Sequence, residues 1–251
     1  MKKRWLFVFA HPDDETFAAG GTIAKLSSTG HEVYLACATS GCKGKSGEFH
    51  FSSREELARF REQEMRSACS ILGVADIALY RYPDGGLQSL DINELAERIA
   101  STIVELQPDA IVTFPPDGVT GHLDHIAISK ATVMAAQLAE AHFPQNKQPS
   151  LYYTSIPHYY DYCKESGPKD KCPITARIDI SDYREHKGKA LQAYRSQIYS
   201  VNRAYPGVME NDYSVICNYE FYTLVRANGQ PRQEKTALPL DELPMLDLMD
   251  D

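Results

Sequence analysis

The sequence predicts an α/β fold in which helices cover both faces of a mostly parallel sheet. Apolar runs typical of buried strands alternate with segments whose apolar residues recur at helical spacing. Glycine-rich and polar turns separate these segments. Neither an internal repeat nor a separate second domain is visible in the 251 residues, so we expect one large domain with a full core.

The strands are predicted from short runs of aromatic and β-branched residues. The first such run, residues 4–10, is almost entirely apolar, as expected of a strand buried on both faces. Further strands are expected at residues 32–39, 77–80, 109–114, 151–154, 176–180 and 221–225.

The helices are predicted from apolar periodicity and from their capping residues. Ser53 and Glu56 form a capping box at the start of one helix, and Gly73 follows its end. The predicted helices span residues 15–29, 53–72, 91–106, about 123–141 and 182–197.

Two regions lie outside this regular pattern. The polar loop 40–52 follows a predicted strand and is long enough to be a lid or substrate loop. Beyond Arg226 the chain is polar and then acidic, so we expect a domain over residues 1–226 and a loosely packed tail over 227–251.

Composition excludes several classes of protein. The net charge is −8 and no block of Lys or Arg occurs, so we expect no nucleic-acid partner. No run of 18 apolar residues is present, which predicts the absence of a membrane span. The basic residues at the N-terminus precede a strand without a cleavage site, and the cysteines form no CxxC pair, so we expect a cytoplasmic protein with free thiols. A homo-oligomer is compatible with this composition.

The first candidate site is the segment His11-Pro12-Asp13-Asp14-Glu15, directly after the first strand. Imidazole and carboxylate groups are zinc ligands. Acidic residues at this position also suit the N-terminus of a helix, so capping is the alternative interpretation.

The second candidate site is the segment His122-Leu123-Asp124-His125, after the fourth strand. The two histidines are three residues apart and share a face in a helical turn. In a doubly wound sheet of order 3-2-1-4-5, strands one and four are neighbours, and ligands bind where their carboxyl ends meet. The two segments should therefore be adjacent in space.

Three protein ligands and an open position are typical of a catalytic zinc site. We expect His11, Asp14 and His125 as ligands of zinc or of another divalent metal. Asp13 is then free to act as general base toward water acidified by the metal. We expect His122 to stabilise the oxyanion, and Asp124 to orient His122 and keep it protonated.

These two motifs closely resemble the LmbE/PIG-L superfamily of zinc-dependent N-acetylglucosaminyl deacetylases. The resemblance is good over roughly the first 130 residues and weaker beyond them. It implies a Rossmann-like, three-layer fold and hydrolysis of the N-acetyl group of a small, glucosamine-containing conjugate. It also implies zinc on His11, Asp14 and His125, with Asp13 as base and His122 near the oxyanion.

Two further stretches are similar to the family. The helix with Arg61 and the loop with Asp84 match segments that bind sugar hydroxyls, so both residues are candidate substrate ligands; a solvated helix residue and a turn former are the alternatives. The chain departs from the family at Thr120, where some members have Tyr, and at Tyr194, where many have His. The latter puts the outer pocket, and hence the substrate, in question.

A tyrosine-rich stretch covers residues 152–162. These rings could line the sugar site, but packing of a half-buried strand and its loop is the more frequent explanation.

Three functions are compatible with the two motifs. The first is removal of the N-acetyl group from an N-acetylglucosamine conjugate, which gives a free amine and acetate. The second is metal-dependent hydrolysis of another amide or of an ester, including a phosphoester, although phosphoester sites often hold two metals. The third is a non-enzymatic binding module with a structural metal, which is usually closed by four ligands.

Overall fold

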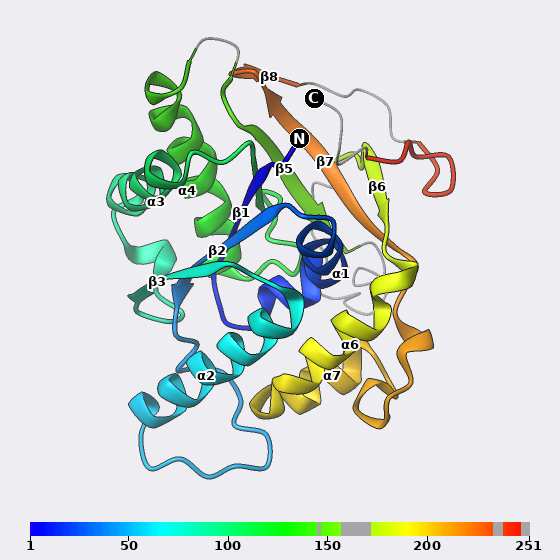
Figure 1. Ribbon diagram of the computed structural model, residues 1–251. Helices are drawn as coiled ribbons and strands as arrows, with labels where there is room; N and C mark the ends of the chain where they lie inside the picture. Colours follow the sequence, from blue (N-terminus) through cyan, green and yellow to red (C-terminus); the bar gives the residue numbers. More distant parts are fainter. Residues whose placement is uncertain (145–146, 157–171, 233–237, 247–251) are drawn as a thin grey trace.

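The computed structural model describes residues 1–144, 147–156, 172–232 and 238–246, and its centre is one sheet of eight strands (Figure 1). Along its main path the strand order is β3-β2-β1-β4-β5-β7-β6, and β8 pairs with β7. The pairs within β3-β2-β1-β4-β5 are parallel, while β7 is antiparallel to β5, β6 and β8. The predicted α/β class with a mostly parallel sheet is therefore confirmed.

The strands are β1 (Arg4–Phe9), β2 (Glu32–Thr39), β3 (Asp76–Tyr82), β4 (Ala110–Thr113), β5 (Ser150–Ser155), β6 (Ala176–Asp179), β7 (Tyr219–Ala227) and β8 (Gln230–Pro231). The α-helices are α1 (Asp14–Ser28), α2 (Arg54–Leu72), α3 (Ile92–Leu106), α4 (Leu123–Ala139), α6 (Arg184–Ala193) and α7 (Ile198–Ala204). Helices α3 and α4 pack together on one face of the sheet, and α1, α2 and α6 pack together on the other (Figure 1).

The central position of β1 brings the two candidate motifs together. Its neighbours are β2 and β4, with Phe7 in register with Leu35 and Val112. All three strands are parallel, so their carboxyl ends lie at the same edge. The segment His11–Glu15 follows β1, and the loop that leads to His122 follows β4. The strand order that we predicted for these elements is the observed one.

Helix α2 begins and ends at its predicted capping residues, whereas the predicted helix over residues 182–197 ends early. The Ser53 side chain accepts a hydrogen bond from the Glu56 amide, and Gly73 ends α2 in the left-handed conformation (φ 78°). The predicted helix 182–197 is wrong in extent. Helix α6 ends at Ala193, because the next residue, Tyr194, leaves the helical conformation (φ −86°, ψ 65°) with its side chain fully buried, and α7 was not predicted.

Helix α1 is broken at Ala19, where φ is −149°. Beyond the break, the Glu220 carboxylate of β7 accepts hydrogen bonds from the Gly21 and Thr22 amides at 3.0 and 2.8 Å. Before it, the Phe17 carbonyl accepts a hydrogen bond from Lys187 Nζ at 3.0 Å. A Cβ on Gly21 would lie 2.4 Å from Ile180, so glycine permits this close approach. Side chains from the C-terminal part thus complete the hydrogen bonding of the broken helix.

The chain beyond Arg226 contacts the sheet at several described positions. Strand β8 pairs with β7, the Arg177 amide donates to Pro244, and the Leu246 amide donates to Arg177. Leu243 is buried. The boundary between residues 226 and 227 stays a prediction.

The structure bears on two further predictions, free thiols and the absence of a membrane span, only within the residues that it describes. Cys37, Cys42 and Cys69 are free thiols. None of the helices described is long and apolar enough to cross a membrane. Of the tyrosine-rich stretch, Tyr152 and Tyr153 are buried in β5, and residues 157–162 lie outside the described part.

Candidate metal centre and active site

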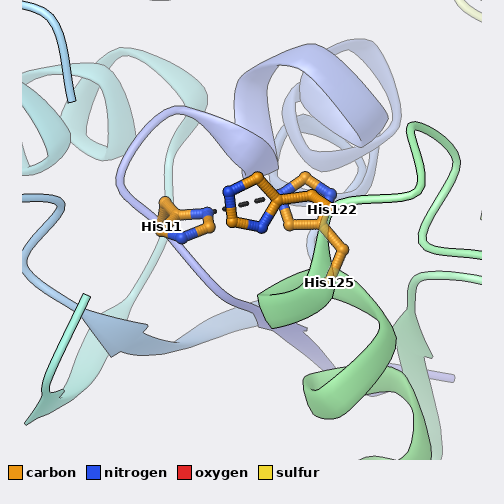
Figure 2. A group of neighbouring side chains, drawn as sticks. All are labelled: His11, His122 and His125. Carbon is orange, nitrogen blue, oxygen red and sulfur yellow. Dashed lines mark hydrogen bonds between the residues drawn. The ribbon is translucent and has the colours of Figure 1, made fainter. Parts of the chain in front are cut away.

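Three of the predicted ligands converge on one point at the carboxyl edge of the sheet. His11 Nδ1 lies 3.3 Å from His125 Nε2, and His125 Nε2 lies 3.3 Å from Asp14 Oδ1. His11 Nδ1 is 3.5 Å from Asp14 Oδ2. Figure 2 shows the rings of His11 and His125 turned toward each other, with His122 beside them. All three candidate ligands are buried, with 7–9% of their surface exposed.

The other nitrogen of each candidate histidine ligand is held by the protein. His11 Nε2 lies 3.1 Å from Asp124 Oδ2, and His125 Nδ1 lies 3.1 Å from the Gly118 carbonyl. Both partners are acceptors, so a neutral ring would carry its proton on this nitrogen and leave the other one, His11 Nδ1 or His125 Nε2, free to bind a metal. Outer contacts of this kind fix the tautomer of metal-binding histidines.

Gly118 is required by this arrangement. Its φ of 66° lies in the left-handed region, and a Cβ there would lie 2.7 Å from the Cβ of His125.

Asp14 is anchored so that one oxygen is left for the common point. Its Oδ2 accepts hydrogen bonds from the Ala10 and His11 amides at 3.2 and 2.8 Å. Burial alone raises the pKa of Asp14, but the neighbouring His125 and His11 outweigh that effect and hold it well below its usual range. Asp14 is therefore a carboxylate over the whole physiological range.

Asp124 has a different partner from the one expected. Its buried carboxylate accepts hydrogen bonds from the Gly85 and Leu87 amides at 2.7 and 2.9 Å and contacts His11 Nε2. Its contact with His122 is through the backbone: the Asp124 amide donates to His122 Nδ1 at 3.2 Å. The carboxylate thus bonds His11 and the turn at residues 85–87, and a role of Asp124 in orienting His122 stays a prediction.

His122 is exposed beside the common point, with its ring centroid 4.9 Å from those of His11 and His125. Desolvation, together with the neighbouring His125 and His11, lowers the pKa of His122. The expectation of a protonated His122 is therefore not supported. Because Nδ1 accepts a hydrogen bond, the neutral ring carries its proton on Nε2 and is a hydrogen-bond donor there.

Asp13 has a strained backbone and a buried carboxyl group. Its φ is 108°, which is uncommon for a residue other than glycine and typical of functional sites. Arg61 Nη2 donates to Asp13 Oδ2 at 3.0 Å and to the Pro12 carbonyl at 2.5 Å. Burial raises the pKa of Asp13 to about 8, against the opposing charge of Arg61. A divalent cation beside it would lower that pKa.

Glu15 holds the backbone of Asp13 in place by a hydrogen bond. Its carboxylate accepts hydrogen bonds from the Asp13 amide at 3.2 Å and from the Tyr194 hydroxyl at 2.6 Å. Glu15 and Tyr194 are both fully buried. Tyr194 stands at the position where many family members have His. It contacts Glu15, which in turn bonds the backbone of the predicted base, Asp13.

Arg61 and Asp84, the predicted sugar ligands, both have protein partners. Arg61 is 3% exposed, and its Nη1 donates to the Gly41 carbonyl at 2.8 Å. Asp84 is 6% exposed; its Oδ1 lies 3.2 Å from His11 Nε2, and its Oδ2 accepts from the Lys43 amide. Arg61 therefore holds Asp13 and the start of the 40–52 loop, and Asp84 lies beside His11. Their contacts with sugar stay predictions.

The donor set fits a divalent metal. Ligands 2.0–2.1 Å from a tetrahedral zinc ion are about 3.3–3.4 Å from one another. His125 Nε2 lies 3.3 Å from both His11 Nδ1 and Asp14 Oδ1, and His11 Nδ1 lies 3.5 Å from the other carboxylate oxygen, Asp14 Oδ2. Two other groupings share His11: one with His122 and His125, and one with Asp84 and Asp124. The second uses His11 Nε2 with Asp124 Oδ2, an oxygen that already accepts from the Gly85 amide, so the set with Asp14 stays our predicted one.

Sequence reasoning missed the supporting contacts that come from the C-terminal part, because it named Tyr194 only for the outer pocket and did not single out Ser196 or Glu220. Tyr194 bonds Glu15 from 179 positions away, and Glu220 bonds the Gly21 amide across 199. Ser196 donates from both its amide and its hydroxyl to the buried Glu64 of α2. No short motif marks such residues, because the contacts depend on how distant segments pack.

Comparison with known proteins shows the family of this chain. A model of the family described as GlcNAc-PI de-N-acetylase (PIG-L) matches residues 6–136. The chain is 34% identical over 203 residues to the probable N-acetyl-alpha-D-glucosaminyl L-malate deacetylase 2 of Bacillus cereus, covering 78% of this chain and 84% of that protein. It is 30% identical over 277 residues to the 1D-myo-inositol 2-acetamido-2-deoxy-alpha-D-glucopyranoside deacetylase of Thermobifida fusca, covering 92% and 95%.

Among solved structures, the fold is similar to that of the N,N'-diacetylchitobiose deacetylase from Pyrococcus horikoshii, with a TM-score of 0.64. That similarity covers 88% of this chain and 83% of the other, at 24% identity, and it shows the shared fold alone. The family model spans more than half of the chain, and the Bacillus cereus relative is similar over most of its length. The chain therefore belongs to the PIG-L (LmbE) family.

Proposed function

We propose that this protein is a metal-dependent amidohydrolase that removes the N-acetyl group from an N-acetylglucosamine conjugate and releases acetate and the free amine. The main support for this proposal is that His11 Nδ1, His125 Nε2 and Asp14 Oδ1 converge on one point. Asp13 and His122 lie beside that point. The relatives described above are deacetylases of glucosamine conjugates, which supports the same substrate class here.

The proposed ligands are His11, Asp14 and His125, and the proposed metal is zinc, although this donor set also suits other divalent ions. When bound, the metal would polarise the carbonyl oxygen and increase the acidity of water. His11 loses a proton on metal binding: burial lowers its pKa, but its bonds to Asp124, Asp14 and Asp84 raise it well above the ordinary value.

Asp13 is the proposed general base. Its carboxylate takes a proton from the attacking water while Arg61 holds it in place through the 3.0 Å contact. A new carbon–oxygen bond forms, the carbon–nitrogen bond breaks, and the proton taken from water is available to the leaving amine. His122, neutral and protonated on Nε2, donates a hydrogen bond to the oxyanion as it develops.

Two finer assignments remain proposals. Arg61 and Asp84 are proposed to contact the sugar, and a rise in KM with little change in kcat for Asp84→Asn would support that role. A cytoplasmic location and a homo-oligomer are likewise predictions.

The test combines metal analysis with acetate release. The purified protein is expected to bind about one equivalent of zinc and to release acetate from at least one glucosamine conjugate in a panel that includes the malate and inositol conjugates. Asp13→Asn should retain the metal and lose about 100- to 10,000-fold in kcat, the usual contribution of a general base. Glu97→Gln, an exposed acid on α3, is the matched control and should be unchanged.

Unchanged acetate release by Asp13→Asn would refute the base assignment. A protein that holds no metal and gains none from added zinc would refute the proposed site.

A further inference from the structure

A pocket of about 410 Å³ opens directly from the candidate metal centre. Asp14 and His125 line one end of it, and its walls come from α1, α7 and β7. Apolar side chains make up most of the described wall, among them Phe17, Phe114, Val119, Ile156, Val215 and Phe221. Its volume is within the range of small-molecule sites and far exceeds the space that the methyl group of an acetamide needs.

The two buried charged groups that line this pocket beyond the metal ligands, Lys187 and Glu220, are already used by the protein. Lys187 Nζ lies 2.7 Å from Glu220 and also bonds the Phe17 carbonyl, and Glu220 accepts from two amides of α1. The Tyr205 hydroxyl donates to the same Phe17 carbonyl at 3.3 Å. The second lining cation, Arg203, lies on the exposed side of α7. With Lys187 and Glu220 paired to each other, the mostly apolar wall favours an apolar group over a polyol or a dicarboxylate.

The predicted sugar ligand Asp84 and the pocket lie toward opposite ends of the strand order, because Asp84 follows β3 and the pocket is lined from β5 and β7. Arg61 and Asp84 contact the loop 41–43, and neither of them lines the pocket. His122 does not line it either. A secondary amide is trans, so its acyl carbon and its nitrogen substituent point away from each other. With the sugar on the side of Arg61 and Asp84, the acyl group points toward the pocket.

From this arrangement we propose that the pocket accepts the acyl chain of the substrate, so that the enzyme hydrolyses N-acylglucosamines with chains longer than acetyl. This inference rests on the proposed function and extends its substrate class. The reaction is unchanged: water adds to the acyl carbon, the carbon–nitrogen bond breaks, and a fatty acid replaces acetate as product, with the proton from water going through Asp13 to the amine.

The test is a series of N-acetyl, N-butyryl, N-hexanoyl and N-octanoyl glucosamines with the zinc-loaded enzyme. Each buried methylene is worth up to about fourfold. We expect kcat/KM to rise at least about tenfold from acetyl to hexanoyl. Octanoate should inhibit the hydrolysis of the acetyl substrate more strongly than acetate does, which tests the pocket without a longer-chain turnover.

Two variants narrow the pocket far from the metal ligands. Ala204→Leu and, as a second choice should that variant fail to fold, Ser200→Leu should lower the ratio of hexanoyl to acetyl hydrolysis. Ala141→Leu adds the same bulk at an exposed site and should leave the ratio unchanged.

The outcomes separate the two proposals. Cleavage of the acetyl substrate with equal or slower cleavage of longer chains overturns the acyl pocket and leaves the proposed function intact. A parallel series of alkyl glycosides of N-acetylglucosamine that alone gains with chain length also overturns it, because the pocket then holds the aglycone. No cleavage of any substrate overturns the proposed function and this inference together.

Discussion

The N-terminal and C-terminal parts of the molecule contribute differently to the site. The part from β1 through the first turn of α4 carries each of the eight residues that the sequence motifs single out. The part from β5 onward carries none of them, but it places Tyr194 on Glu15, Ser196 on Glu64, and Lys187 with Glu220 on the broken helix α1. It also forms much of the wall of the apolar pocket.

The N-terminal part thus supplies the residues proposed for the chemistry, and the C-terminal part supplies contacts that hold them in place. Ligands and base need specific side chains at strand ends, and short motifs supply them. Support needs only a hydrogen bond or a charge in the right place, and it can come from any segment that packs nearby. Four predictions test the separation, from the largest expected effect to the smallest.

The largest effect is expected for a ligand of the N-terminal part. His125→Ala removes a nitrogen that lies 3.3 Å from both His11 and Asp14. We expect loss of the bound metal and a fall in activity of at least about 1,000-fold, with the fold retained, since metal catalysis supplies several kcal/mol. Metal analysis, circular dichroism and acetate release check it. Full activity with a full equivalent of zinc would contradict the ligand assignment.

The second-largest effect is expected for a supporting ion pair in the C-terminal part, Lys187 with Glu220. Lys187 and Glu220 are 3–5% exposed and 2.7 Å apart, so Lys187→Met leaves a buried charge unpaired and should lower the free energy of unfolding by about 3–5 kcal/mol. Denaturant unfolding measures it. Lys189→Met in the same helix breaks an exposed pair with Glu185 and is the matched control, with little change expected.

Equal destabilisation by both variants would show that the Lys187 pair has no special role. A smaller metal affinity of Lys187→Met at temperatures where it is fully folded would sharpen the comparison, since it would show that the break in α1 also positions Asp14.

Asp124 belongs to the N-terminal motif but acts as support. The Gly85 amide bonds Oδ2 and the Leu87 amide bonds Oδ1, so Asp124→Asn leaves one of these two bonds in place and removes the negative charge beside His11 Nε2. Outer contacts of metal-binding histidines are worth about 10- to 100-fold in metal affinity. Competition with a chelator measures that loss. An unchanged affinity with a changed pH profile of kcat would instead return Asp124 to the role we first predicted, acting through His122.

The smallest effect is expected for Tyr194→Phe. The change removes the hydroxyl that donates to Glu15 at 2.6 Å and leaves a buried acceptor with one partner fewer, which should cost about 1–3 kcal/mol of stability. Thermal unfolding checks it, with Tyr199→Phe on exposed α7 as control. A large fall in kcat without a loss of stability would mean that Tyr194 belongs to the chemistry and not to its support.

Much of the fold was predictable because it depends on local periodicity and on general rules of sheet topology. The runs around Phe7 and Val112 identified β1 and β4, and the doubly wound order made them neighbours. That adjacency predicted that His11 and His125 meet, and their nitrogens lie 3.3 Å apart. The end of α6 was missed, because Tyr194 leaves the helix for a partner in Glu15 that no nearby residue indicates.

The sequence by itself determined the α/β class, the edge of the sheet that carries the site, and the residue types that could hold a metal there. These depend on short motifs and on strand order. Only the tertiary structure decided that Asp124 supports His11, that Arg61 holds Asp13, and that an apolar pocket leads away from the ligands. The physical reason is that side-chain direction and cavity shape are set by the packing of distant segments, whereas strand ends are brought together by the backbone alone.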